Sequence, residues 1–463
     1  MLVWALGLCQ RASADQPAGG CRIVAVHVVP PVEMIGDVAD PGRRTTTPLG
    51  GLSDIASNHV TAATPRVRPA DHRLSLWVIT DRGPNGTVET PSARRRTLLD
   101  RSFVPSIARL DLDATHRSAD EPAAARVSRI VPLANRTGRP LSGRPNGVGR
   151  DEPILDPRNA ATIPPDPDGI DSEGLVRMRN GSFWVAEEYR PSLLEVSPAG
   201  RAVARYVPAG QAIPGAGMDV HEVFPAAYGA RRDNRGFEAL AVSPDETRLW
   251  LLLQSPLDHP VAKAAAHTGN VRLLAFDVAT RSPVAEYIYR LGDPEAEGFL
   301  DRGAPPEDGK LCAIAALDTE TLLVLEQSDG GLARLYACRL AGATDTLGRD
   351  PSPASDDLPI EQIADLPGAG IVPVGKRLVA DLATLLPRMA HTVFSERAES
   401  PPPLKLEGMA VLDASHVVIV NDNDFGIHDK SGPKGRPPRT CLWVVELGAP
   451  LWPELDGHAA ANP

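Results

Sequence analysis

The chain of 463 residues lacks any long apolar run: no stretch approaches the roughly 20 residues that a membrane-spanning helix needs. It also lacks an excess of basic residues, because 48 Lys and Arg stand against 59 Asp and Glu, a formal net charge of −11. Nucleic-acid binders rely on surplus positive charge to neutralise phosphates. We therefore predict no membrane span and no nucleic-acid partner, and expect a monomeric globular protein.

Several catalytic signatures are missing as well. No Gly-x-Ser-x-Gly elbow occurs, and the nearest segment, Gly51-Leu52-Ser53-Asp54-Ile55, fails at its last position. His-Glu-x-x-His, Cys-x-x-Cys and a glycine-rich nucleotide fingerprint are also absent. A serine-esterase mechanism of the elbow type thus lacks sequence support, and water activated by a metal ion is the best available nucleophile.

Cysteine is scarce, with five residues in the chain. An apolar run at residues 2–9 is followed by Ala12-Ser13-Ala14, an A-x-A cleavage pattern. We therefore predict a signal peptide over residues 1–14 and a secreted or periplasmic protein. Cleavage would leave an even number of cysteines, which permits two disulfides of open connectivity: Cys21, Cys312, Cys338 and Cys441.

What the chain does contain is one phrase that returns four times, at residues 51–56, 171–176, 236–242 and 406–411. Each copy has an acidic residue just before a short apolar strand, followed by a second strand that ends in a polar or acidic residue. The acidic residues are Asp54, Glu173, Glu238 and Glu407. Repetition on this scale indicates one supersecondary unit used several times around a common centre.

Short β-rich runs bounded by Gly, Pro, Asp and Ser sort into groups of four. We predict an all-β fold: a single β-propeller of five four-stranded blades over residues 21–448, followed by a tail at 449–463. The last group holds only three strands, and Arg22–Val28 supplies the fourth, which closes the ring and removes an exposed sheet edge. A sixth blade is the alternative, if residues 295–300 or 371–374 belong to a degenerate blade.

The fourth blade is the least regular in sequence. We expect residues 360–366 to be its outer strand. Leu378, Leu382 and Leu385 have helical spacing, so a short inserted helix is expected at residues 378–386, ending near Pro387. Residues 138–170, rich in Pro, Gly and Asp, are expected to be a long loop between the first two blades, and loops of this length are usually functional or disordered.

In a propeller the start of each inner strand lies beside the end of the second strand, on one face. Carboxylates crowded there would repel one another unless a cation neutralised them. Oxygen ligands without a His or Cys cluster suit Ca²⁺ before Mg²⁺. We predict a calcium site at the axis, with Cys312 breaking the acidic series; alternatively, the acids cap turns. The predicted ligands are Asp54, Asp81, Glu173, Glu238, Glu326, Glu407, Asp422 and Asn423.

Basic residues follow on the loops of the same face. Arg and Lys around a metal centre suit a small anionic substrate, phosphorylated or carboxylated, although exposed loops also carry charge for solubility. The predicted substrate-binding residues are Arg82, Arg190, Arg235 and Lys405. Three residues are candidates for the general base, a choice that the sequence leaves open: Glu187, Glu188 and His221.

Five segments suggest a family. They are Asp81-Arg82-Gly83-Pro84-Asn85-Gly86, Asp171-Ser172-Glu173-Gly174-Leu175, residues 184–191 (Trp-Val-Ala-Glu-Glu-Tyr-Arg-Pro), residues 234–240 (Asn-Arg-Gly-Phe-Glu-Ala-Leu), and Glu407-Gly408-Met409-Ala410 with Asn421-Asp422-Asn423-Asp424. With these segments in order over most of its length, the chain resembles the phytase-like family with esterase-like activity, a group of exported propeller proteins. Similarity to propeller phytases would imply calcium-bound water attacking a phosphomonoester, with further calcium and basic side chains holding the phosphate.

Three functions are compatible with these features. The first is a calcium-dependent hydrolase of phosphate esters or related esters. The second is a lactonase or sugar-acid hydrolase, because other propellers use one axial divalent ion for that reaction. The third is a propeller without catalytic activity that binds a ligand or a protein and holds calcium only for structure. A propeller scaffold does not decide among them, since fold and function separate readily.

Overall fold

A computed structural model of the chain describes eleven segments: residues 20–32, 47–57, 72–91, 94–147, 153–261, 263–292, 308–328, 331–350, 358–394, 404–426 and 437–451. The predicted signal peptide at residues 1–14, residues 295–300 and most of the predicted C-terminal tail lie outside the described residues.

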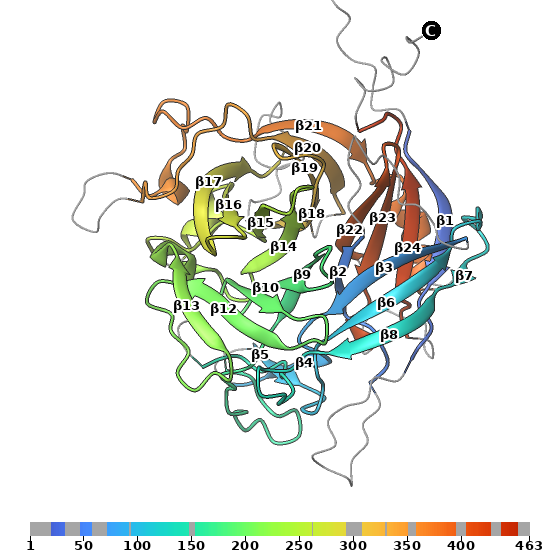
Figure 1. The fold of residues 1–463 in the computed structure, drawn as a ribbon, viewed down its shortest axis with the longest axis horizontal. Helices are drawn as coiled ribbons and strands as arrows, with labels where there is room; N and C mark the ends of the chain where they lie inside the picture. Colours follow the sequence, from blue (N-terminus) through green and yellow to red (C-terminus); the bar gives the residue numbers. More distant parts are fainter. Residues whose placement is uncertain are drawn as a thin grey trace, which may run out of the picture.

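Among the described strands, five sheets of four or five strands are arranged around one axis, which confirms the predicted five-bladed propeller (Figure 1). Blade 1 has the order β2 (Leu52–Ala56), β3 (Arg73–Thr80), β6 (Ser106–Asp113) and β8 (Arg126–Pro132). Blade 2 consists of β9 (Ser172–Arg177), β10 (Phe183–Glu187), β11 (Ser192–Val196), β12 (Ala202–Pro208) and an added outer strand, β13 (Asp219–Phe224). Blade 3 consists of β14 (Phe237–Val242), β15 (Arg248–Leu253), β16 (Asn270–Asp277) and β17 (Ser282–Arg290).

The remaining two blades complete the ring. Blade 4 consists of β18 (Gly309–Ala316), β19 (Thr321–Ser328), β20 (Ala333–Arg339) and β21 (Gly375–Asp381). Blade 5 consists of β22 (Lys405–Asp413), β23 (His416–Asp422), β24 (Cys441–Glu446) and β1 (Arg22–Val28), with β7 (Ala123–Ala124) at its edge. Strand β1 pairs antiparallel with β24, so the predicted closure by the N-terminal strand agrees with the observed pairing.

The five inner strands, β2, β9, β14, β18 and β22, pack against one another in that order, and β22 returns to β2. Glycine permits two of these close approaches. A Cβ atom added at Gly174 would lie 2.7 Å from the Cβ of Leu240 in the next blade, and one at Gly408 would lie 2.7 Å from the Cα of Asp54. Both distances are too short for any side chain, so a closed five-strand hub requires glycine at these positions.

The blades adhere through layers of buried apolar side chains rather than through one central core. The sheets are buried on both faces, and aromatic residues fill the larger gaps: Trp184 and Phe276 pack edge to face at 5.9 Å between blades 2 and 3. Trp443, Val417 and Leu335 belong to the layer between blades 4 and 5. Burial at about 25 cal/mol per Å² of apolar surface makes these layers the main source of stability.

Blade 4 differs from the sequence-based prediction. Residues 360–366 are not a strand: Ile360–Gln362 forms the 3₁₀ helix η5, and the outer strand is β21. The leucines at 378–386 span the end of β21 and the start of helix α1 (Leu386–Phe394), so their helical spacing is accidental. Pro387 lies in the first turn of α1 instead of ending a helix, because the first turn needs no backbone N–H from that position. Residues 371–374 lead into β21 and form no sixth blade.

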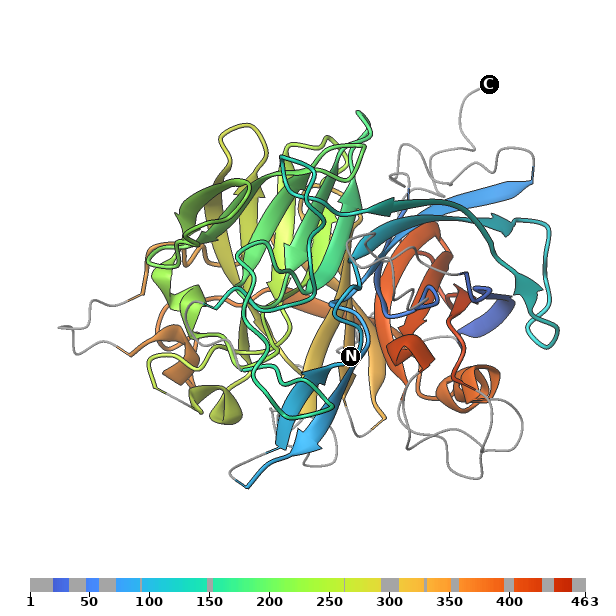
Figure 2. The same ribbon diagram turned by 90° about the horizontal axis from the view of Figure 1, so that it is seen from below.

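Further 3₁₀ helices lie in the described connections: η1 (Ala226–Ala230), η2 (Ala264–His267) and η6 (Asp424–Gly426). A hairpin that the sequence analysis missed, β4 (Asn85–Glu89) and β5 (Arg94–Leu98), follows β3 and projects from the ring (Figure 2). The predicted long loop at 138–170 packs against this hairpin, with Leu155 bridging to Thr97. The loop is further fixed by Arg139, which pairs with Asp166 at 2.6 Å and with Asp168 at 2.7 Å.

The described cysteines are unbridged, so none of the permitted disulfides forms among them. Cys312 and Cys338 lie on β18 and β20, with β19 between them. Within the described part of the chain, no helix has the length and apolar character needed to cross a bilayer.

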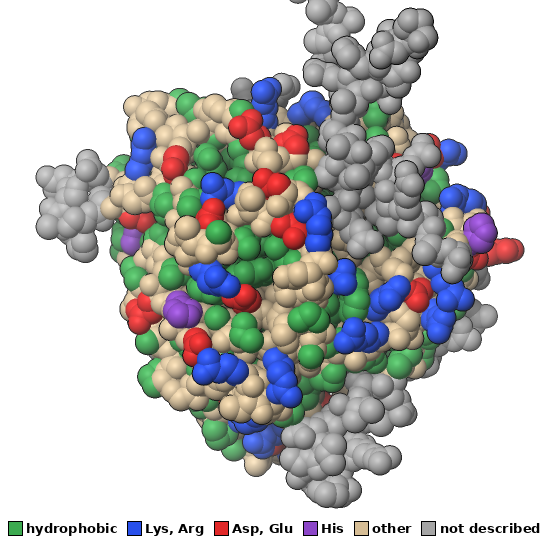
Figure 3. All heavy atoms as spheres, in the orientation of Figure 1, with side chains coloured by type: hydrophobic (Ala, Val, Ile, Leu, Met, Phe, Trp, Pro, Cys, Tyr) green, Lys and Arg blue, Asp and Glu red, His purple; other side chains and the backbone are tan. Residues whose placement is uncertain are grey.

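The two ends of the central channel differ. The inner strands begin on the face that carries the β4–β5 hairpin, and this face holds the acidic residues of the repeat. At the other end all five inner strands contribute apolar side chains to an open hollow of about 60 Å³, among them Ile55, Val176 and Val411. Figure 3 shows this second face, with hydrophobic side chains gathered at its centre.

Candidate metal centre at the propeller axis

Each of the five inner strands carries a β-bulge at the same level. In blade 3, for example, Phe237 pairs with Leu253 and Ala239 with Leu252, so Glu238 between them has no partner of its own. A bulge turns the extra residue out of the regular ladder, and such bulges recur beside functional sites. The five bulged residues are Ser53, Glu173, Glu238, Cys312 and Glu407.

The register moves one predicted ligand out of this series. In blade 1 the bulged residue is Ser53, and Asp54 occupies the position of Gly174 and Gly408 in other blades. Asp54 accepts hydrogen bonds from the backbone N–H of Ile55 at 2.7 Å and of Leu175, in the next blade, at 2.8 Å. Asp54 therefore links blades 1 and 2, and the structure does not bring it into the axial cluster.

A second ring of equivalent residues follows the ends of the second strands. In each blade, the residue on the second strand that pairs just before the bulge is followed by one member of this ring. The members, from blade 1 to blade 5, are Asp81, Glu188, Gln254, Gln327 and Asp422. Side chains of this ring lie beside those of the bulge ring. Together the two rings surround the mouth of the channel. Blades 1, 2, 3 and 5 contribute carboxylates to them, and blades 3 and 4 each contribute one glutamine amide.

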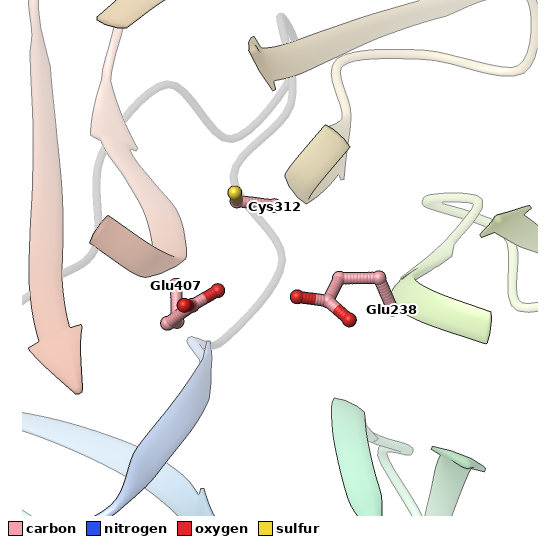
Figure 4. Close-up of side chains that lie close together, drawn as sticks. All are labelled: Glu238, Cys312 and Glu407. Carbon is pink, nitrogen blue, oxygen red and sulfur yellow. The ribbon is translucent and has the colours of Figure 1, made fainter. Parts of the chain in front are cut away.

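Glu238, Cys312 and Glu407 meet at the centre of the mouth. One ligand atom of each lies within 4.8 Å of those of the other two. Figure 4 shows the two carboxylates facing each other across the axis, with the sulfur of Cys312 directed toward the same space. The prediction that Cys312 takes the place of an acid in blade 4 agrees with this register.

A second group consists of Asp171, Glu173 and Glu188, whose oxygen atoms also approach within 4.8 Å of one another. Arg82, a predicted substrate-binding residue, is 4% exposed and lies against this group. Its guanidinium forms ion pairs with Asp171 and with Glu188, the latter at 3.2 Å, and it lies 5.1 Å above the ring of Tyr189. Arg82 is therefore an internal counter-charge for two of the carboxylates.

The fifth blade contributes a third group. Asp422 pairs with Lys405 at 3.1 Å, and Lys405 also forms an ion pair with Asp424. Charge on Asp422 acts on Asp81 in blade 1. Lys405 thus lies at the rim as predicted, although it is already paired with two carboxylates.

Burial and mutual repulsion act on the whole set. The pKa of Glu173 is raised by burial and then by Asp171, Glu238 and Glu188. The pKa of Glu238 is raised by burial and by Glu407. Burial and Asp171 raise the pKa of Glu188 to about 8, and burial and Asp424 raise that of Asp422 to about 7. Without a cation, this mouth favours bound protons over ionised carboxylates.

The donor set fits a hard divalent cation. Oε2 of Glu238, Oε2 of Glu407 and Oε1 of Glu188 are buried and have no hydrogen-bond partner within the described residues. An unpaired buried carboxylate oxygen costs free energy, and a cation relieves that cost. Carboxylate oxygens from several blades are the ligands that Ca²⁺ takes.

Two predicted site residues face the other way because side chains alternate along a strand. Glu187 precedes Glu188 and accepts hydrogen bonds from the Ser192 hydroxyl at 2.8 Å and from the Tyr189 and Arg190 amides. Glu326 precedes Gln327 and lies in an inter-blade layer, where it pairs with Lys376 at 2.9 Å and accepts a hydrogen bond from Tyr289 at 2.8 Å. Neither side chain joins the axial cluster.

The other predicted residues lie around the cluster or away from it. Asn423 accepts a hydrogen bond from the backbone of Gly51 at 3.0 Å and ties blade 5 to blade 1. The buried Arg190 donates to Gln211. Arg235 donates to the carbonyl of Gly309 at 3.3 Å, near the mouth. His221 is exposed on β13, the outermost strand of blade 2, and stacks on Tyr206.

Asp171 is the functional candidate that sequence reasoning missed. It begins one of the repeated phrases, but the phrase predicts a ligand only at Glu173, two residues later. The sequence does mark Asp171 in one way, because no other glutamate of the repeat has an acid two residues before it. The residue at that position is Gly236 before Glu238 and Lys405 before Glu407. An acid found in one repeat alone indicates a local partner, which here is Arg82.

The fold and the mouth define a five-bladed propeller protein with an acidic axial site. Residues 47–425 match the family model described as phytase-like, esterase-like activity of phytase. This match covers more than three quarters of the chain, so the chain belongs to the phytase-like family.

One relative is an uncharacterized secreted protein of Arthroderma benhamiae, 26% identical over 295 residues. The aligned part covers 56% of this chain and 56% of the relative, so only about half of the relative's length is matched.

Solved structures resemble the chain more remotely. The WD40 repeats of RRP9 have a TM-score of 0.33 at 10% identity, covering 92% of this chain and 99% of that one. The PQQ-bound aldose sugar dehydrogenase of Streptomyces coelicolor has a TM-score of 0.31 at 12% identity, covering 93% and 99%. Likenesses this weak carry no argument about activity.

Proposed function

We propose that the protein is an exported, calcium-dependent hydrolase of phosphate esters or related esters. The observation that carries the proposal is the convergence of carboxylates from different blades at one mouth, with buried oxygen atoms of Glu188, Glu238 and Glu407 that lack hydrogen-bond partners within the described residues. Membership of the phytase-like family supports an ester-hydrolysing reaction.

In this proposal Glu173, Glu238 and Glu407 hold the cation, together with Asp171 and Asp422. When bound, Ca²⁺ supplies the charge that activates a water molecule and offsets the charge of the leaving oxygen. The side chains around it bind and orient the substrate. Arg82 fixes Asp171 and Glu188 in place through its two ion pairs.

Glu188 is the residue that we assign to proton transfer. Its carboxyl group lies at the mouth, with Oε1 buried and without a hydrogen-bond partner within the described residues. Burial and Asp171 raise its pKa to about 8 in the metal-free protein, and a cation held by Asp171 would lower that pKa toward neutrality, where a carboxylate can accept and release a proton. Glu187 is unsuited to this role because its oxygen atoms already accept hydrogen bonds from Ser192, Tyr189 and Arg190.

Basic side chains at the mouth would bind an anionic substrate. Lys310 and Arg235 both act electrostatically on Cys312 and therefore lie close to the axis. Guanidinium and ammonium groups at such a rim hold phosphate or carboxylate oxygens through charge-assisted hydrogen bonds. We propose a small anionic substrate for this reason.

Export is part of the same proposal. The A-x-A pattern at Ala12-Ser13-Ala14 follows an apolar run, and the Arthroderma relative is described as secreted. A secreted or periplasmic location also supplies the millimolar calcium that weak extracellular sites require.

The test is hydrolysis of p-nitrophenyl phosphate by the purified protein, with a parallel panel of carboxyl esters and lactones. We expect activity that is lost in EGTA and restored by Ca²⁺, and a loss of about 100-fold or more in kcat/KM for Glu173→Gln, because removing one ligand weakens both cation binding and catalysis. Asp219→Asn, on the exposed outermost strand of the same blade, is the control.

The panel separates the alternatives. Hydrolysis of lactones alone would identify the second enzymatic function. Calcium binding that raises the melting temperature without hydrolysis of any ester would identify a binding propeller and refute the proposed reaction.

A further inference from the structure

The axial mouth contains one side chain that does not suit a calcium site. Cys312 occupies the bulge position of blade 4, where blades 2, 3 and 5 have glutamate. Its sulfur lies within 4.8 Å of a carboxylate oxygen of Glu238 and of Glu407. A thiol is a poor ligand for Ca²⁺, which takes oxygen, but it is a strong ligand for Zn²⁺.

The surroundings of Cys312 differ from those of other described cysteines. The sulfur of Cys21 donates to the carbonyl of Asp381 at 3.3 Å, and that of Cys338 lies 3.6 Å from the carbonyl of Tyr336. Cys312 is 2% exposed and faces two carboxylates across the channel axis (Figure 4). Its thiol is thus part of the mouth itself.

A second observation points to a bound ion at this position. Oε2 of Glu238, a residue only 3% exposed, has no hydrogen-bond partner among the described residues, and neither has Oε2 of Glu407. Both carboxylates are directed into the space beside the sulfur. Two such carboxyl oxygens and one thiol around a single space form a set of ligands that suits a cation.

We propose that Glu238, Cys312 and Glu407 form a mixed carboxylate–thiolate site for a thiophilic divalent cation of the zinc class. Three protein ligands leave one position for water, as in catalytic zinc sites. This assignment narrows the calcium site of the proposed function to Asp171 and Glu173, beside the thiolate site, and leaves Glu188 to proton transfer. The mouth would then hold two different cations side by side.

The geometry requires only a small contraction. Ligands around Zn²⁺, at about 2.3 Å for sulfur and 2.0–2.2 Å for oxygen, lie roughly 3.5 Å apart. The three ligand atoms now lie within 4.8 Å of one another, and rotation about the glutamate side-chain bonds supplies the difference. Coordination converts the thiol to a thiolate, and the displaced proton leaves to solvent.

This inference rests on the proposed function in taking the mouth as a cation site, but its test does not depend on any hydrolytic activity. Co²⁺ is a spectroscopic substitute for Zn²⁺, because cobalt bound to a thiolate absorbs in the near ultraviolet and cobalt bound to oxygen alone does not. We expect the wild-type protein, stripped with EDTA, to bind one Co²⁺ with this thiolate band and to lose the band when one equivalent of Zn²⁺ is added.

Three variants locate the site. Cys312→Ser should abolish the band and weaken Zn²⁺ binding by about tenfold or more. Glu238→Gln keeps the thiol and should weaken binding by a similar factor while retaining the band. Cys338→Ser, a buried cysteine two strands away, is the matched control and should leave both band and affinity unchanged.

Two outcomes would overturn the inference: no thiolate band in the wild type, or a band that survives in Cys312→Ser. If Cys312→Ser does not fold, as judged by circular dichroism, Glu238→Gln decides, and unchanged Zn²⁺ affinity in that variant refutes the site. Calcium-dependent ester hydrolysis is measured separately, so its absence would reject the proposed function without touching the thiolate band.

Discussion

Two neighbouring glutamates of blade 2, Glu187 and Glu188, are both buried, yet their surroundings are opposite. Glu187 faces away from the axis and has hydrogen-bond donors at both oxygen atoms. Glu188 faces the mouth, where Oε1 has no hydrogen-bond partner within the described residues and where burial and Asp171 raise its pKa to about 8. Burial raises the pKa of Glu187 as well, but there Arg205, the Ser192 hydroxyl and the Arg190 amide lower it.

The same alternation of direction occurs in blade 4, where Glu326 pairs with Lys376 and the next residue, Gln327, lies in the ring around the mouth. There Gln327 is an uncharged amide that bonds to the backbone of Leu404 and Leu406.

The difference separates carboxylates that stabilise the fold from carboxylates that destabilise it in the absence of a ligand. Fully paired buried charges hold the blades together, whereas like charges gathered at one point are tolerated because a cation binds there. Four predictions test this division, from the largest expected effect to the smallest.

Removing a paired carboxylate should have the largest effect. Glu326→Leu leaves the ammonium of Lys376, 2% exposed, without its counter-charge, and we expect the free energy of unfolding to fall by about 3 kcal/mol or more. Urea denaturation measures the change. The double variant Glu326→Leu/Lys376→Met should recover most of the loss, and a double variant as unstable as the single one would contradict the assignment.

Removing an axial carboxylate should have the opposite effect on the metal-free protein. Glu238→Gln relieves repulsion with Glu407 and burial of a charge, so we expect the melting temperature in EGTA to rise. Cation affinity, measured by calorimetry, should fall by about tenfold or more. If the variant is less stable than the wild type in EGTA, Glu238 stabilises the metal-free fold, as the paired carboxylates do, and the prediction is wrong.

The pH dependence of stability follows from the raised pKa values. Glu188 titrates at about 8 and Asp422 at about 7 in the folded chain, against ordinary values of 4.5 and 3.8. Between these limits the folded state binds more protons than the unfolded state, so stability falls as pH rises. In EGTA the melting temperature should decrease from pH 5 to pH 8, and saturating Ca²⁺ should flatten the decrease. A rise with pH in EGTA would refute the axial repulsion.

Asp54 should give the smallest effect. Its two oxygen atoms accept backbone hydrogen bonds from Ile55 and Leu175, and an amide in Asp54→Asn can replace only one acceptor. We expect a loss of about 1 kcal/mol in stability, with cation affinity equal to that of the wild type by calorimetry. A weaker cation affinity would return Asp54 to the set of ligands.

The sequence predicted the propeller well because its signal is repeated. Short strands and turns of similar kind recur from blade to blade, so an ambiguity in one copy is resolved by the others. The repeated phrase groups Glu173, Glu238 and Glu407, and the structure places these three residues at equivalent bulges. The prediction for the outer strand of blade 4 was wrong because this strand, β21, lies outside the repeated phrase and follows β20 after a connection of more than thirty residues.

Two predicted ligands lie away from the axial cluster for reasons of register. A bulge shifts the alternation of side chains by one residue, and no composition rule signals which residue is extruded. In β2 the bulge extrudes Ser53, and Asp54 bonds to blade 2 instead. In β19, which pairs regularly with β20, the alternation of side chains alone places Glu326 in the inter-blade layer and Gln327 in the ring around the mouth. The position of Arg82 beside Asp171 depends on contact between blades 1 and 2, and spacing along the chain carries no information about such contacts.

Pairing of β1 with β24 joins residues at opposite ends of the chain: Arg22 bonds Glu446 across a separation of 424 positions. Contacts this distant in sequence form slowly and late. The ring can therefore close only after nearly the whole polypeptide has been synthesised. A truncated chain that ends before Cys441 would lack β24, and β1 would have no antiparallel partner in blade 5.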